Sequence, residues 1–238
     1  MQKSRVVASV LTAGFAAVLA SRIAAQSGAE KPLWETLIKK PLPEDSQPTI
    51  SVFSISGSSA PPVQPPIGAG HTHAGPVFVY ILQGEIETQV EPDPPAIYRP
   101  GEFFYEAPMH VHRFQRNLSK TEPGRVIVFQ AGNTGQANPA VKLLLQEPLR
   151  TTVNQELSLL RLTLPAGALS GTRDHSGPGV VYVLEGKVEA SDATYRAGDL
   201  FPEPANLAGL TFKNASSSKP AKLLLYQVSD MGGPGSAR

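Results

Sequence analysis

The stretch from residue 70 to residue 84 reads GHTHAGPVFVYILQG, and it decides the fold. It opens with two histidines one residue apart and continues as an apolar run, residues 77–82, that is rich in β-branched and aromatic side chains. A short run of this kind that ends at a glycine predicts a buried β-strand. Because alternate residues of an extended chain point to one side, His71 and His73 can face the same way.

This stretch occurs a second time in the chain. Residues 75–84 match residues 177–186, with the same Gly-Pro start and the same Val-Tyr-x-Leu-x-Gly end. Further segments match in the same order, namely residues 37–42 with 144–149, and 125–130 with 222–227. A repeat of this length, in which only the loops differ in length, indicates a duplicated domain.

The remaining segments also predict short strands. Residues 49–56 and 85–90 alternate apolar with polar or small residues, and residues 126–130 form another apolar run. The chain has 21 glycines and 23 prolines, as expected where many tight turns join short strands. Residues 57–70 contain four prolines and predict a loop. We therefore expect an all-β protein of the barrel or sandwich type.

The first 25 residues have the features of an export signal. Lys3 and Arg5 precede a stretch of apolar and small residues, 6–20, and Ala25 or Ala20 offers a small-residue cleavage site. The stretch is shorter than the roughly 20 residues that span a bilayer. We expect a bacterial-type signal peptide, residues 1–25, and a periplasmic or secreted mature protein without stable membrane insertion. An uncleaved anchor or a misassigned start is the alternative.

Composition excludes several classes of function. The chain has no cysteine, which excludes disulfides, a lipid anchor on cysteine and thiolate metal ligands. The formal net charge is +1 and no basic block occurs, so nucleic acid is not an expected partner.

The histidines carry the chemistry. Four of the five form two His-x-His pairs, His71 with His73 and His110 with His112. Neutral imidazole is a good ligand for zinc, copper, iron or nickel, and three such ligands leave open positions for water or substrate. Surface or core histidines are the alternative reading, but two pairs in a histidine-poor chain favour a metal site.

Both pairs lie in stretches that resemble the conserved motifs of the cupin family. Residues 70–84 resemble the first motif, in which two histidines precede a glutamate and a glycine. Residues 100–112, followed by Asn117, resemble the second motif, which supplies the last histidine. The resemblance implies that His71, His73 and His112 bind one divalent metal ion (Fe, Mn, Ni, Zn or Cu).

Together with the repeat, the resemblance implies two tandem cupin barrels, which are double-stranded β-helices of the jelly-roll type. The N-terminal cupin would span residues 33–135 and hold the metal. The C-terminal cupin would span residues 142–230 and be degenerate, because the positions of the three histidines and of Val77 are taken by Arg173, His175, Gly209 and Gly179. Residues 173–175 could bind an anion, although a salt-bridged surface loop is the simpler reading.

The first motif departs from the family at one position, because Val77 stands where the family has its glutamate. Water or His110 is the expected replacement ligand, with Glu106 and Gln89 as alternatives. Glu106 recurs as Glu203 in the second copy, which favours a structural role for this carboxylate. His110 and Glu106 are also the candidates for acid–base catalysis.

The site predicts a metal-dependent enzyme that acts on a small organic molecule. The resemblance implies dioxygenase, decarboxylase, isomerase or lyase chemistry, and a site without a carboxylate would favour an anionic substrate. A non-catalytic periplasmic or secreted protein that binds a small ligand or a metal is the alternative. The protein is expected to be a monomer or a homodimer.

Overall fold

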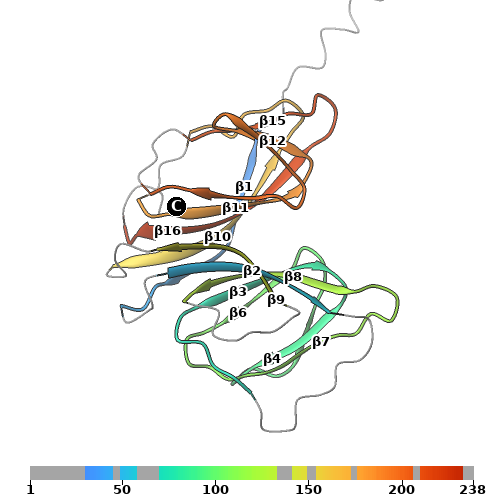
Figure 1. Ribbon diagram of the computed structural model, residues 1–238, viewed down its shortest axis with the longest axis vertical. Coiled ribbons are helices and arrows are strands. Elements are labelled where there is room, and N and C mark those ends of the chain that lie inside the picture. Colours follow the sequence, from blue (N-terminus) through green and yellow to red (C-terminus); the bar gives the residue numbers. More distant parts are fainter. Residues whose placement is uncertain are drawn as a thin grey trace, which may run out of the picture. The chain divides into compact units, whose positions relative to one another are not determined.

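The structure, a computed structural model, describes residues 30–44, 49–57, 70–132, 141–148, 154–172, 176–205 and 210–232. Pro32–Arg238 form one compact unit. In the described ranges every regular element is a β-strand, so the predicted all-β class is confirmed (Figure 1). No helix in this part of the chain is long and apolar enough to cross a membrane. The predicted signal peptide, most of the loop predicted at residues 57–70, and residues 173–175 lie outside the described residues.

The strands are short, as the sequence predicts. Those that precede residue 132 are β1 (Leu33–Pro41), β2 (Thr49–Gly57), β3 (Val77–Gln83), β4 (Ile86–Val90), β5 (Ala96–Tyr98), β6 (Phe103–Glu106), β7 (His112–Asn117) and β8 (Gly124–Ala131). Those that follow are β9 (Val141–Pro148), β10 (Gln155–Leu164), β11 (Gly179–Glu185), β12 (Lys187–Ala190), β13 (Ala193–Arg196), β14 (Leu200–Glu203), β15 (Phe212–Asn214) and β16 (Ala221–Asp230).

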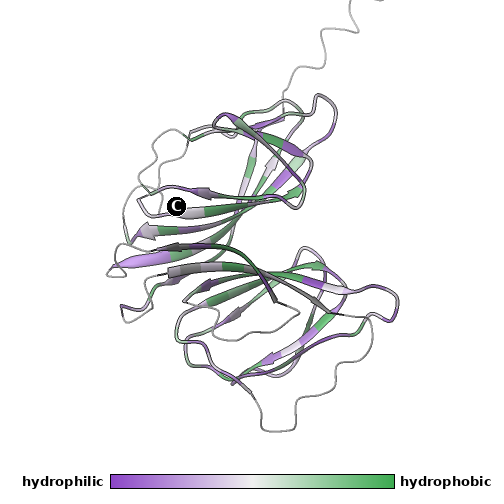
Figure 2. Ribbon diagram, viewed as in Figure 1, coloured by the Kyte–Doolittle hydropathy of each residue, from purple (hydrophilic) through white to green (hydrophobic). Residues whose placement is uncertain are grey.

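The strands form two equivalent pairs of sheets. The first pair, here called the first barrel, combines the sheet β6-β3-β8-β2-β9 with the sheet β5-β4-β7. The second barrel combines β1-β10-β16-β11-β14 with β13-β12-β15. Each barrel has its own apolar core between its two sheets, as when Val79 of β3 packs in one cluster with Ile86 of β4. Figure 2 shows hydrophobic residues concentrated along the strands of the two larger sheets.

A third apolar cluster contains residues of both larger sheets. Tyr226 of β16 lies at its centre, fully buried, with its ring stacked on Phe129 at 5.1 Å between centroids. Phe78 contacts the same ring edge-on at 5.7 Å. Aromatic contacts of this kind add to the free energy gained by burying apolar area, so this cluster joins the two sheets.

Each barrel takes its edge strand from the other copy of the repeat. β1 pairs with β10 of the second barrel, and β9 pairs with β2 of the first barrel. The predicted domain boundaries, 33–135 and 142–230, instead assign β1 to the first barrel and β9 to the second. The repeat shows that the two strands are equivalent, but it holds no information on which sheet each one joins.

The register places repeated residues at equivalent points of the two barrels. One row of directly paired residues crosses the first large sheet, and its members are Gln146, Ser51, Gln130, Val77 and Glu106. The matching row in the second large sheet is Lys39, Ser158, Gln227, Gly179 and Glu203. Directly paired residues point to the same face of a sheet. Both rows therefore end on a glutamate that faces the barrel interior.

Two equivalent glycines allow the segments just before β3 and β11 to approach β8 and β16 closely. A Cβ on Gly75 would lie 2.0 Å from the carbonyl oxygen of Ala131, and one on Gly177 would lie 2.7 Å from that of Val228. We expect Gly75→Ala to destabilise the protein by about 3 kcal/mol, because backbone rather than a side chain must shift. The melting temperature, followed by circular dichroism, should fall by roughly 6–12 °C.

Gly177→Ala serves as the comparison, with a smaller expected decrease because its contact is longer. Equal melting temperatures for Gly75→Ala and the parent would show that the close approach is not required.

Candidate metal centre

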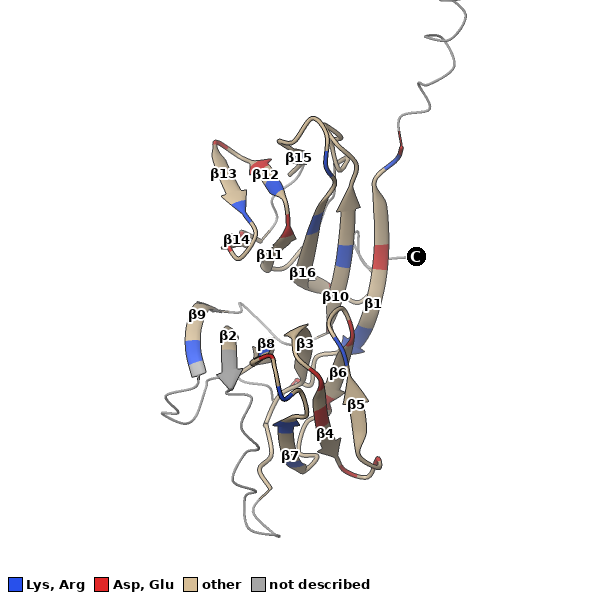
Figure 3. Ribbon diagram, turned by 90° about the vertical axis from the view of Figure 1, so that its right-hand side faces the viewer, with Lys and Arg blue, Asp and Glu red and all other residues tan. Residues whose placement is uncertain are grey.

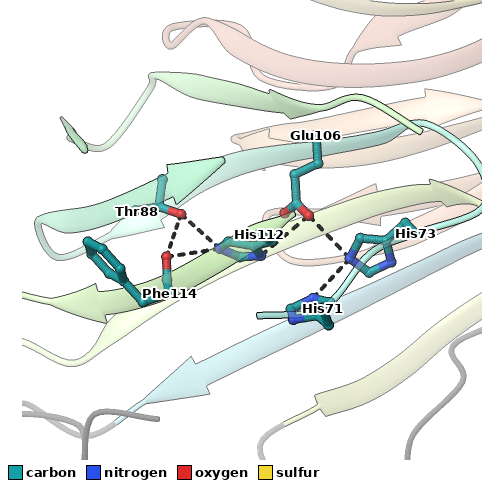
Figure 4. A network of polar contacts seen from close by, with 6 residues as sticks. All are labelled: His71, His73, Thr88, Glu106, His112 and Phe114. Carbon is teal, nitrogen blue, oxygen red and sulfur yellow. Dashed lines mark hydrogen bonds and ion pairs between the residues drawn. The ribbon is translucent and has the colours of Figure 1, made fainter. Parts of the chain in front are cut away.

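Four side chains meet at one end of the first barrel. His71 and His73 precede β3, Glu106 ends β6 and His112 begins β7 (Figure 4). One donor atom from each residue lies within 4.8 Å of all the others. Glu106 Oε2 is 3.1 Å from His73 Nε2 and 3.3 Å from His112 Nδ1, while the Nε2 atoms of His71 and His73 are 3.1 Å apart. These four residues are called the cluster below.

Backbone pairing brings the two His-x-His segments together. His71 and His112 form an isolated antiparallel bridge, in which each N–H donates to the other's carbonyl oxygen at 3.1 and 2.8 Å. The N–H of Met109 donates to the carbonyl of His73 at 2.8 Å, from a turn in which Met109 has a φ of 62°. These hydrogen bonds hold the imidazoles of His71 and His73 close to that of His112, which is about forty residues further along the chain.

The carboxylate reaches the cluster from β6, which pairs with the strand that holds Val77. Val77 is buried and pairs directly with Glu106 across β3 and β6, so both residues face the same side of the sheet. The structure thus brings to the cluster the carboxylate that was expected only as an alternative ligand. The sequence contained no such signal, because Glu106 recurs as Glu203 in the second copy, which lacks the three histidines, and this recurrence favoured a structural role.

The other side chains considered as replacements for the missing glutamate, His110 as the preferred one and Gln89 as an alternative, lie elsewhere. His110 is exposed and is not part of the cluster. The side-chain amide of Gln89 donates to the carbonyl of Asp93 at 3.4 Å. Glu106, and neither His110 nor Gln89, therefore stands beside the three histidines.

The protonation states suit metal ligands. Burial on its own raises the pKa of Glu106, but the imidazoles of His112 and His73 outweigh it and hold the pKa at about 2. Burial, with the neighbouring His112 and His73, lowers the pKa of His71. Glu106 is therefore ionised and His71 is neutral at pH 7, and these are the forms that bind metal.

The arrangement fits a cation because lone pairs converge at its centre. Glu106 Oε2 is buried and has no well-aligned hydrogen-bond donor among the described residues. Protein ligands lie about 2.0–2.2 Å from zinc, so donor atoms around one ion are separated by roughly 3–4.4 Å. The donor atoms of the cluster need to move by only a few tenths of an ångström to meet that requirement.

The charged residues of the smaller sheet pair with one another. Arg113 of β7 contacts Glu91, which follows β4, at 2.6 Å, and Arg116 of β7 contacts Glu87 of β4. Figure 3 shows acidic positions on β4 and basic positions on β7. The charges of each pair neutralise each other. Among the described residues of this barrel, the cluster is therefore the candidate for binding a ligand.

A cavity of about 460 Å³ lies apart from the cluster. Its wall includes Tyr80, Leu82 and Leu184, and two ion pairs, Glu35 with Arg161 at 2.8 Å and Glu185 with Lys222 at 2.8 Å. Because these charges are already paired, the cavity does not point to a particular ligand.

Comparisons with known proteins agree with this fold. Residues 63–130 match the family described as "Cupin domain", which covers both His-x-His segments. No curated protein matches the chain. The structure resembles salicylate 1,2-dioxygenase from Pseudaminobacter salicylatoxidans, with 15% identity over 79% of this chain and 76% of that chain and a TM-score of 0.53.

A second structure of that enzyme, with gentisate adducts, gives 15% identity over 76% of this chain and 68% of that chain, and a TM-score of 0.51. At this level of identity the likeness concerns the fold alone. The family match covers residues 63–130, which include both motifs that resemble the cupin family, and so it concerns this part of the first barrel.

Proposed function

We propose that the first barrel binds one divalent metal ion through His71, His73, His112 and Glu106. The observation that carries the proposal is the convergence of three imidazole nitrogens and one carboxylate oxygen, from three separate segments, within 4.8 Å. Three nitrogen ligands and one oxygen ligand are compatible with Fe, Mn, Ni, Zn or Cu. The second barrel would support the first.

We propose further that the protein is a metal-dependent enzyme for a small organic molecule, of the dioxygenase, decarboxylase, isomerase or lyase type. The bound metal would supply Lewis acidity or a coordination position for a co-substrate. His112 and Glu106 are buried, while His71 is exposed and His73 is half-buried, so substrate would approach from the side of His71.

The cluster changes two details of the expected chemistry. Glu106 would lower the charge of a site with a divalent ion from +2 to +1, so the preference for an anionic substrate is weaker than three histidines alone imply. Its low pKa also makes Glu106 a ligand rather than an acid at neutral pH. His110, two residues before His112, is then the remaining acid–base candidate.

The likeness to salicylate 1,2-dioxygenase supports aromatic carboxylic acids as the first substrates to try, and the first 25 residues support action after export. The alternative proposal, a non-catalytic protein that captures a small ligand or a metal, uses the same cluster.

The proposal is tested by elemental analysis of the untagged mature protein. We expect one equivalent of metal in the parent and in His110→Ala, whose histidine lies outside the cluster, and less than about a tenth of an equivalent in His112→Ala. Oxygen uptake and product formation with salicylate, gentisate and small diketones then separate the enzyme from the binder. A parent that holds no more metal than His112→Ala would contradict both.

A further inference from the structure

We propose that Thr88 is a positioning residue of this site, because its hydroxyl holds His112 in the tautomer whose Nδ1 lone pair faces the cluster. The use of that lone pair as a metal ligand rests on the proposed function. The tautomer itself is a property of the metal-free protein and can be measured there.

The tautomer follows from a closed triangle of polar contacts (Figure 4). His112 Nε2 lies 2.8 Å from Thr88 Oγ1 and 3.0 Å from the carbonyl oxygen of Phe114. Thr88 Oγ1 donates to the same carbonyl at 2.8 Å. A carbonyl oxygen can only accept, so the hydroxyl hydrogen points to Phe114 and a hydroxyl lone pair faces the imidazole. His112 Nε2 therefore carries its hydrogen and donates it to both oxygens.

This hydrogen bonding decides what the other ring nitrogen does. A neutral imidazole has one N–H, so a hydrogen on Nε2 leaves a lone pair on Nδ1. That atom lies 3.3 Å from Glu106 Oε2, a buried oxygen without an aligned hydrogen-bond donor among the described residues. The Nδ1 lone pair therefore faces the donor atoms of Glu106, His71 and His73, where the proposed metal ion would bind.

A strand irregularity places the ring against Thr88. The pairing of β4 with β7 shifts between Gln89 and Val90, which pair with Phe114 and His112, so Arg113 is the extra residue of a β-bulge. Bulges are frequent beside functional sites because they redirect a side chain. Thr88 is 3% exposed and His112 is 7% exposed, so both side chains are held by their surroundings.

The second barrel provides an internal comparison. Ile86 pairs with Asn117, and Val188 pairs with Asn214, so Ala190 stands where the first barrel has Thr88. Ala190 has no hydroxyl and is equally buried. The second barrel, which lacks the three histidines of the cluster, therefore also lacks a hydroxyl at the position of Thr88.

Thr88→Val and Thr88→Ser test the role. Valine keeps the shape and removes the hydroxyl, while serine keeps the hydroxyl. Long-range ¹H–¹⁵N NMR of the metal-free proteins at about pH 8 should show the Nε2–H tautomer of His112 in the parent and in Thr88→Ser, and a mixture in Thr88→Val. Metal affinity, measured by competition with a chromophoric chelator, should fall about 10- to 100-fold in Thr88→Val. In Thr88→Ser it should stay within about threefold of the parent.

Thr163→Val, on β10 of the second barrel, is the matched control and should leave both readouts unchanged. A single Nε2–H tautomer in Thr88→Val would overturn the positioning role, as would a mixture of tautomers with parental affinity. If the parent binds no metal, the proposed function fails, and the NMR measurement still decides whether Thr88 sets the tautomer.

Discussion

Glu106→Gln is expected to lower metal affinity by more than about a hundredfold, beyond the 10- to 100-fold loss typical of an outer-shell partner. Glu106 is the one carboxylate of the cluster, and its buried Oε2 lies 3.1 Å from His73 and 3.3 Å from His112. The neutral amide would remove the negative charge from a centre that is otherwise built of imidazoles. Isothermal titration calorimetry with Zn²⁺, or competition with a chelator, measures the change.

The chain offers a matched control for this substitution. Glu203 pairs with Gly179 as Glu106 pairs with Val77, and both glutamates are 3% exposed. Glu203→Gln should keep the metal affinity of the parent, because the metal-ligating histidines are proposed only in the first barrel. Equal affinities for Glu106→Gln and Glu203→Gln would show that the carboxylate is structural in both barrels.

The second large effect is expected from cutting the chain between the two copies of the repeat. A break within residues 136–140, which follows the predicted domain boundaries, separates β9 from β2 and β1 from β10. Each fragment then exposes the sheet edge that the other fragment covers, together with its half of the apolar cluster around Tyr226. We expect neither fragment to fold alone, and we expect the two to form one complex when they are co-expressed.

Size-exclusion chromatography and the dispersion of amide NMR signals test this expectation. A fragment of residues 42–150, which contains β2 to β9, is the comparison because it keeps every strand of the first barrel. It should bind metal, whereas the fragment of residues 33–135 should not. Cooperative unfolding of an isolated 33–135 fragment with bound metal would show that the exchange of edge strands is dispensable.

Much of the fold could be predicted from the sequence because the deciding signals are local. The apolar run at residues 77–82 and its repeat predict buried strands, and the His-x-His spacing predicts two side chains on one face. The structure brings His71, His73 and His112 together as the motifs implied. Periodicity along the chain was sufficient for the strands and for the His-x-His spacing, whereas the grouping of the three histidines was implied by the resemblance to the cupin motifs.

The contacts of Glu106 and Thr88 with the site depend on which strands are neighbours in the sheets. Glu106 enters the cluster because β6 pairs with β3 in a register that sets it opposite Val77. Thr88 reaches His112 through the bulge in the pairing of β4 with β7. Neither relation leaves a trace in the spacing along the chain, since both join residues that are 24 to 29 positions apart.

The sequence by itself therefore determined the class of fold, the repeat and the three histidines of the proposed site. Tertiary structure alone decided that Glu106 and not His110 joins them, that Thr88 Oγ1 lies 2.8 Å from His112 Nε2, and that β1 and β9 exchange barrels. The physical reason is that side-chain direction is a local property of an extended strand. Strand partners and register instead follow from the burial of whole sheets.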